Sequence, residues 1–137
     1  MLTCQLICVP PDLVPKVWPH VSGLIYVAMK KGDISSFQPI AESVLSGKSL
    51  LWVAWNEAEN QIKAAAVTEL HQTEWSKFCV IVACGGKDMK TWLDTRGPIY
   101  EYAKAEGCKA MRLYGRKGWK DALPDWRVTR FVMERSL

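Results

Sequence analysis

The sequence predicts an α+β fold, a single domain over residues 1–137 with one mixed central sheet and helices on both faces. Apolar residues switch between strand and helix periods in the order β-α-α-β-β-β-α-β-α-β. Three strand segments follow one another closely in the middle of the chain, which favours antiparallel pairing. A strand, a long helix and another strand fill residues 78–114, which favours one parallel crossover.

Length and composition exclude several classes of protein. The 137 residues fit one domain, and 49% hydrophobic with 23% charged residues exclude a disordered chain. No apolar run approaches the roughly 18 residues that a membrane span needs. The N-terminus has neither the basic leader nor the cleavage site of a secretory signal. We therefore expect a cytoplasmic protein without a membrane partner.

The N-terminal elements are a strand over residues 3–9 and a long amphipathic helix. Asp12 can cap this helix by accepting hydrogen bonds from its first amides. Apolar residues recur at steps of three and four over residues 13–29, which is the helical period. Pro19 should kink or divide the helix near Trp18, because proline lacks an N–H.

A second helix is expected to begin at Ser35 or Ser36 and to end at Gly47. The first apolar run after it is continuous, which is typical of a strand covered on both faces. The runs that predict the three central strands cover residues 50–55, 62–70 and 77–84.

The period changes to 3.6 from Met89, which predicts a long helix that ends at Gly107. Gly97-Pro98 implies a break, with Pro98 in the first turn of a second segment. The remaining patterns predict a strand over residues 110–114, a short helix over 118–123 and a final strand over 126–134.

The five cysteines include no CxxC pair, and neither histidine lies near two of them in the sequence, so no metal site is expected. We interpret the cysteines as buried free thiols of a reducing compartment. Cys84 stands beside two glycines, but no histidine is adjacent in the sequence to activate it as a nucleophile.

The positive charge is concentrated at the C-terminus. Residues 107–137 hold eight Lys/Arg and three Asp/Glu, a net charge of +5, which leaves −1 for residues 1–106. Such a segment could contact nucleic acid or the phosphates of a small cofactor. We favour the cofactor and expect no nucleic-acid partner.

Several segments resemble the GCN5-related N-acetyltransferase (GNAT) superfamily, and within it a small branch that bacteriophages encode. The resemblance runs from about residue 10 to the end of the chain. The segments that carry it are Val17-Trp18-Pro19, Leu51-Trp52-Val53-Ala54-Trp55, Ala64-Ala65-Ala66-Val67-Thr68, Ala83-Cys84-Gly85-Gly86-Lys87-Asp88-Met89, Tyr102-Ala103-Lys104-Ala105-Glu106-Gly107-Cys108 and Gly115-Arg116-Lys117-Gly118-Trp119.

The resemblance implies that acetyl-CoA binds where two neighbouring parallel strands splay. The pantetheine arm would pair with the backbone of Val82, Ala83 and Cys84, and the pyrophosphate would lie on a Gly-rich loop at a helix N-terminus, where free amides favour anions. This loop is shorter than the family's usual one, and Asp88 could instead cap the helix. The residues of the implied loop are Gly85, Gly86, Lys87 and Asp88, with Arg116 and Lys117 as further phosphate ligands or as a solvated loop.

The resemblance also implies an acid and a base. Many members use a tyrosine near the start of the last helix to protonate the leaving thiolate, but residues 118–123 contain none, so Tyr114 is the nearest phenol. Glu69 is the candidate general base, since an amine must be neutral to attack a thioester. Glu69 could equally be a solvated strand residue, and Tyr114 a packing aromatic.

The implied function is transfer of an acetyl group from acetyl-CoA to an amine of a small molecule or a protein. The alternative is a catalytically inactive phage protein of this fold that acts in the host cytoplasm by binding a host or virion protein. A homodimer is one implied state, since this fold often pairs through exposed strands or helices.

Overall fold

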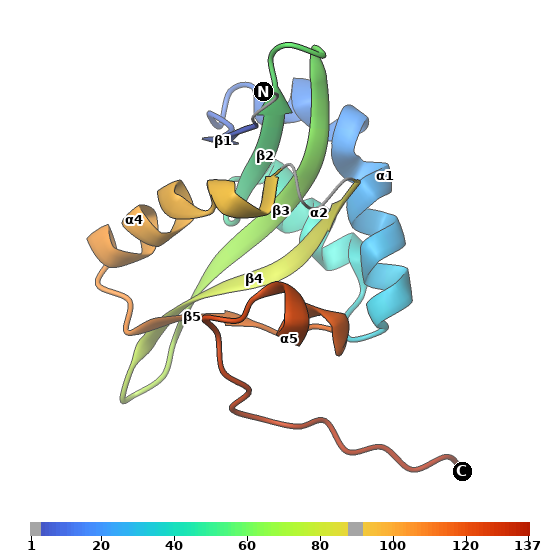
Figure 1. Ribbon diagram of the computed structural model, residues 1–137, viewed down its shortest axis with the longest axis vertical. Helices are drawn as coiled ribbons and strands as arrows, with labels where there is room; N and C mark the ends of the chain where they lie inside the picture. Colours follow the sequence, from blue (N-terminus) through green and yellow to red (C-terminus); the bar gives the residue numbers. More distant parts are fainter. Residues whose placement is uncertain (1–3, 88–91) are drawn as a thin grey trace.

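Five strands form one mixed sheet in the computed structural model, which describes residues 4–87 and 92–137 (Figure 1). Adjacent strands pair antiparallel from β1 to β4, and β5 pairs parallel with β4 at one edge. The strands are β1 (Gln5–Cys8), β2 (Leu50–Asn56), β3 (Gln61–Gln72), β4 (Lys77–Gly86) and β5 (Ala110–Leu113), in that spatial order. The mixed sheet and the single parallel crossover are therefore confirmed.

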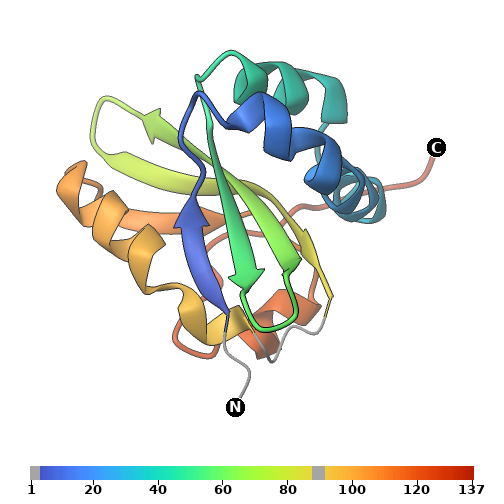
Figure 2. The same ribbon diagram turned by 90° about the horizontal axis from the view of Figure 1, so that it is seen from above.

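Helices cover both faces of the sheet (Figure 2). One face carries α1 (Val14–Gly32) and α2 (Phe37–Leu45). The other carries α4 (Gly97–Ala105), which follows the short 3₁₀ helix η1 (Leu93–Thr95). The remaining helix, α5 (Gly118–Ala122), follows β5. No helix of the described residues is long and apolar enough to cross a bilayer.

The two faces bury different side chains. Under α1 and α2 the core is aliphatic, and Val21, Ile25 and Val67 are fully buried. Under α4 it is aromatic, because Trp52 packs edge-on against Tyr102 with ring centroids 5.8 Å apart. The indole of Trp52 donates a hydrogen bond to Oγ1 of buried Thr68 (3.0 Å), so this polar pair costs little to bury.

Two expectations for α1, a cap at Asp12 and a division at Pro19, are wrong, whereas a kink at Pro19 stays a prediction. Asp12 does not cap it: Leu13 is the N-cap and makes no side-chain cap bond. The carbonyl of Pro10 accepts hydrogen bonds from the N–H groups of Leu13 (2.9 Å) and Val14 (3.2 Å), so a backbone carbonyl satisfies the N–H groups at the start of the helix. Pro19 does not divide the helix, which is continuous from Val14 to Gly32. One missing N–H is tolerated where the helix packs its buried face on the sheet.

The C-terminal half departs further from the sequence pattern. The break at Gly97-Pro98 is confirmed, because η1 ends at Thr95 and Pro98 lies in the first turn of α4. The start of the predicted long helix at Met89 lies outside the described residues. The predicted strand over residues 126–134 is wrong: residues 127–137 have no secondary structure and run away from the sheet (Figure 1). These residues have a strand-like composition, but they pair with no strand among residues 4–87 and 92–137.

Candidate functional site

An opening lies between β4 and β5. The two strands pair only from Phe78–Ala110 to Ile81–Leu113. Beyond Ile81, β4 continues to Gly86, and among the described residues it pairs there with β3 alone. After β5 ends, one backbone edge of β4 therefore has no strand neighbour in the described part of the chain.

The register shows which backbone groups face this opening. The N–H of Lys87 donates to the carbonyl of Lys63 (2.9 Å), in the same register as the pair Gly85–Ala65. Alternate residues of a strand direct their backbone groups to opposite sides. The N–H and C=O groups of Cys84 and Gly86 therefore point away from β3, toward the opening.

Two pockets meet at the opening, one on each face of the sheet. Both are lined by Ile81, Cys84, Leu113 and Trp119. The pocket on the α1 face, of about 50 Å³, is also lined by the C-terminal end of α1 and by the residues that follow β5. The pocket on the α4 face, of about 60 Å³, is lined almost wholly by apolar side chains.

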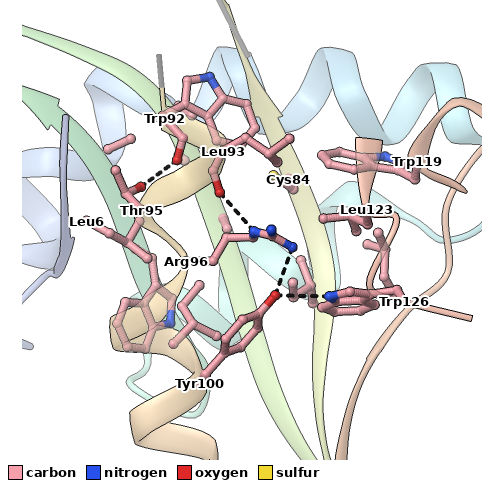
Figure 3. A pocket seen from close by; sticks show the side chains of 18 residues that line it. Leu6, Cys84, Trp92, Leu93, Thr95, Arg96, Tyr100, Trp119, Leu123 and Trp126 are labelled. Atoms are coloured by element: carbon pink, nitrogen blue, oxygen red, sulfur yellow. Dashed lines mark hydrogen bonds between the residues drawn. The ribbon is translucent and has the colours of Figure 1, made fainter. Parts of the chain in front are cut away.

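Aromatic side chains and one arginine wall the pocket on the α4 face (Figure 3). The hydroxyl of Tyr100 accepts hydrogen bonds from Arg96 Nη1 (2.9 Å) and from the indole of Trp126 (2.9 Å). Arg96 Nε also donates to the carbonyl of Leu93 (2.8 Å). This network holds η1, α4 and the segment after α5 together around the pocket. Sequence reasoning missed it, because its members lie up to 33 residues apart, from Leu93 to Trp126, and share no motif.

Gly85 and Gly86 lie in β4 and not in a loop, so the expected loop at this point is wrong. A Cβ on Gly85 would stand 2.3 Å from the carbonyl oxygen of Leu24 in α1. A Cβ on Gly86 would stand 2.5 Å from the Cβ of Ala64 in β3. The two glycines therefore allow neighbouring backbone to pack closely. Asp88 lies outside the described residues, and the coenzyme contacts of Gly85, Gly86 and Lys87 stay predictions.

Glu69 lies on the α1–α2 face of the sheet, beside a serine pair. Its Oε2 accepts from Ser49 Oγ (3.1 Å), which also bonds Ser43 Oγ on α2, and its Oε1 bonds His71 Nε2 (2.9 Å). Glu69 pairs with Val80 in β4, just before the pairing of β4 with β5 ends at Ile81. It shares a face with one of the pockets but does not line it.

Tyr114 and Arg116 do line the pocket on the α1 face, together with Val82 and Ala83. Tyr114 is half-exposed, at 52% of its full surface. Lys117 is exposed and lines neither pocket. The structure thus brings Tyr114 and Arg116 to the opening and leaves Glu69 and Lys117 outside its walls.

The Cys84 side chain is half-buried and lines both pockets at the opening. Burial raises the pKa of Cys84 from the ordinary 9.0 to about 12, so the sulfur stays protonated at neutral pH. A protonated thiol is a poor nucleophile. Cys84 is thus of interest for its backbone position. Across residues 4–87 and 92–137, no three His, Cys, Asp or Glu side chains gather to hold a metal.

The raised pKa of Cys84 makes the fold sensitive to alkali. The thiol stays protonated in the folded chain up to about pH 12 but ionises in the unfolded chain near its ordinary pKa of 9.0. Stability therefore falls as the pH rises from 9 toward 12, by about 1.4 kcal/mol per pH unit for one such thiol. Cys84→Ala is expected to reduce this slope in urea unfolding curves measured between pH 9 and 11. An unchanged slope would contradict the burial of the thiol.

Comparison with known proteins gives a match at the level of structure. No family model matches the sequence, and no curated protein matches it. A probable acetyltransferase superposes with a TM-score of 0.68 at 7% identity over 97% of this chain and 96% of its own. An aminoglycoside acetyltransferase from an uncultured soil metagenomic sample gives 0.67 at 11% identity over 98% and 96%.

A GNAT family acetyltransferase from Staphylococcus aureus superposes with a TM-score of 0.60 at 10% identity over 98% of this chain and 99% of its own. The chain has the GNAT acetyltransferase fold. The opening between β4 and β5 lies where the sequence resemblance implies two splaying parallel strands. The finer assignment to a phage-encoded branch stays a prediction, since these structures give it no support.

Proposed function

We propose that this chain is an N-acyltransferase that moves an acetyl group from acetyl-CoA to an amine of a small molecule or a protein. The observation that carries the proposal is the free edge of β4, where the backbone groups of Cys84 and Gly86 face the opening beside β5. The pantetheine arm of coenzyme A contains amides, and an extended chain with amides can pair with a strand edge as an added strand would.

The residues at the opening fit the rest of the coenzyme. Arg116 lines the pocket on the α1 face, and Lys87 follows the last residue of β4 and is exposed. Both can carry positive charge toward the pyrophosphate, with Lys117 as a third cation beyond the pocket wall. Acetyl-CoA supplies a thioester, which is an activated acyl donor.

In this proposal one side chain accepts a proton and another donates one. The amine nitrogen bonds to the thioester carbonyl carbon and loses a proton to Glu69 through a water, and the C–S bond breaks. The leaving thiolate receives a proton from the hydroxyl of Tyr114, which lines the pocket. Glu69 lies on the same face of the sheet as that pocket, held by Ser49 and His71.

Glu69→Gln is expected to lower kcat about 100-fold, the usual contribution of a general base. The amide oxygen of glutamine still accepts from Ser49, so binding of acetyl-CoA and thermal stability should be unchanged. The measurement is turnover of acetyl-CoA with an amine that the intact chain acetylates. Glu42→Gln, at an exposed position of α2, is the matched control and should keep full activity. Equal activity of both variants would remove Glu69 from the reaction.

Calorimetric titration with acetyl-CoA tests the proposal itself. The intact chain is expected to bind, and Arg116→Ala to bind about ten-fold more weakly, as for the loss of one charged hydrogen bond. Arg127→Ala, on the exposed C-terminal segment, is the control and should bind like the intact chain. Absence of heat and of a thermal shift at millimolar acetyl-CoA would overturn the proposal.

One observation favours the alternative, a binding protein without catalysis. Trp75, at the turn between β3 and β4, is 83% exposed. An exposed tryptophan at a protruding turn suits a protein interface. In that case Trp75→Ala would abolish binding of the host or virion partner, and the intact chain would acetylate no amine. Turnover of any amine with acetyl-CoA would reject this alternative.

A further inference from the structure

The C-terminal segment, residues 127–137, leaves the domain with apolar side chains in solvent. Phe131, Val132 and Met133 are 87%, 84% and 93% exposed, and Val128 is 53% exposed. A lone chain gains nothing by exposing such a cluster, and contiguous exposed apolar residues mark interaction sites. The segment points away from the sheet of its own chain (Figure 1).

The composition of the segment is that of a strand. Residues 127–134 read Arg-Val-Thr-Arg-Phe-Val-Met-Glu and contain neither glycine nor proline. β-Branched and aromatic residues of this kind favour strands. Apolar side chains occur on both parities, at Val128 and Val132 and at Phe131 and Met133, which is typical of a strand covered on both faces.

The sheet offers an edge for such a strand. β5 is the last strand in the sheet order, and among the described residues only β4 pairs with it. Its outer edge carries backbone N–H and C=O groups that no described strand satisfies, which is a template for an added strand. Met111 and Leu113 of β5 are only half-buried, so an added strand would also cover apolar surface.

The point of departure of the segment is fixed. The indole of Trp126 donates to the hydroxyl of Tyr100 (2.9 Å), and its N–H donates to the carbonyl of Leu123 (3.0 Å). The chain is therefore held to its own domain up to Trp126 and is directed outward from there. This direction favours the β5 edge of another molecule over its own.

We propose that residues 127–134 form a strand that pairs with the outer edge of β5 in a second copy of this chain. Two copies can exchange these segments reciprocally, which gives a closed, two-fold symmetric dimer. The exchange covers Phe131, Val132 and Met133 and satisfies the exposed edge of β5 at once. The inference does not depend on the acyltransferase proposal.

Light scattering, measured as the 137-residue chain elutes from a size-exclusion column, tests this proposal. A dimer is expected at protein concentrations of about 10–200 µM. Phe131→Asp with Val132→Asp should raise the dimer dissociation constant at least ~100-fold, as two buried charges in an interface do. The fold should stay intact, since both side chains are solvent-exposed in a single copy. Ser136→Asp with Leu137→Asp adds the same two charges beyond the strand and is the control, which should stay dimeric.

Amide hydrogen exchange on the same samples locates the contact. The amides of residues 128–133 and of β5 should exchange slowly in the dimer and fast in the Phe131→Asp, Val132→Asp variant. A monomeric 137-residue chain would overturn the proposal, including one whose segment is protected on its own β5. A dimer that survives the double substitution at Phe131 and Val132 would also overturn it.

Discussion

Gly85→Ala is expected to destabilise the fold by about 3 kcal/mol, the upper part of the usual range for an overpacked core. A Cβ at this position stands 2.3 Å from the carbonyl oxygen of Leu24 and 3.1 Å from the Cβ of Ala28. The nearest atom belongs to the backbone of α1, which cannot rotate away as a side chain can. Helix and strand must separate, and the aliphatic core between them loosens. Urea unfolding monitored by circular dichroism measures the loss.

Gly23→Ala is the matched control. Gly23 lies in the middle of α1, and a Cβ there meets nothing within 4 Å. Alanine in a helix interior stabilises by roughly 0.5–1 kcal/mol relative to glycine. The two substitutions should therefore act in opposite directions. If Gly85→Ala kept full stability and lost only coenzyme binding, Gly85 would belong to a phosphate loop and its placement in β4 would be wrong.

Tyr114→Phe is expected to lower kcat by about 100-fold or more, the contribution of a positioned general acid. The hydroxyl is the group removed, and Tyr114 lines the pocket at the opening between β4 and β5. Phenylalanine keeps the ring, so the affinity for acetyl-CoA and the unfolding free energy should change little. Steady-state turnover and calorimetric titration on the same preparation separate the two effects.

Tyr26→Phe is the control for this prediction. Tyr26 is 48% exposed, close to the 52% of Tyr114, but it lies on α1 and packs edge-on against Phe37. It lines neither pocket and should keep full activity. Equal loss in both variants would indicate a general effect of removing a surface hydroxyl. No loss in Tyr114→Phe would leave the leaving thiolate to be protonated by water.

Periodicity in the sequence was sufficient for the sheet. The runs that predict strands at residues 50–55, 62–70 and 77–84 lie within β2, β3 and β4. A short continuous apolar run in a domain of this size is typical of a buried strand. The crossover from β4 through α4 to β5 followed from the change of period. Family resemblance added the place of the opening between these two strands.

Single positions were harder to predict, because their roles depend on distant neighbours. Gly85 and Gly86 read as the start of a loop, since paired glycines usually punctuate loops. Only the approach of Leu24 and Ala64 shows that they are packing residues of a strand. Strand preference at residues 126–134 was visible, but a preference does not supply a pairing partner. Arg96, Tyr100 and Trp126 converge through folding alone.

Amide hydrogen exchange at the end of β4, with and without acetyl-CoA, tests the central claim most directly. The claim is that the free edge of β4 beside β5 pairs with the coenzyme. The amides of Cys84 and Gly86 face the opening, whereas those of Ala83 and Gly85 pair with β3. Acetyl-CoA should slow exchange at Cys84 and Gly86 and leave Ala83 and Gly85 unchanged. Binding that leaves the exchange at Cys84 and Gly86 unaltered would contradict the claim.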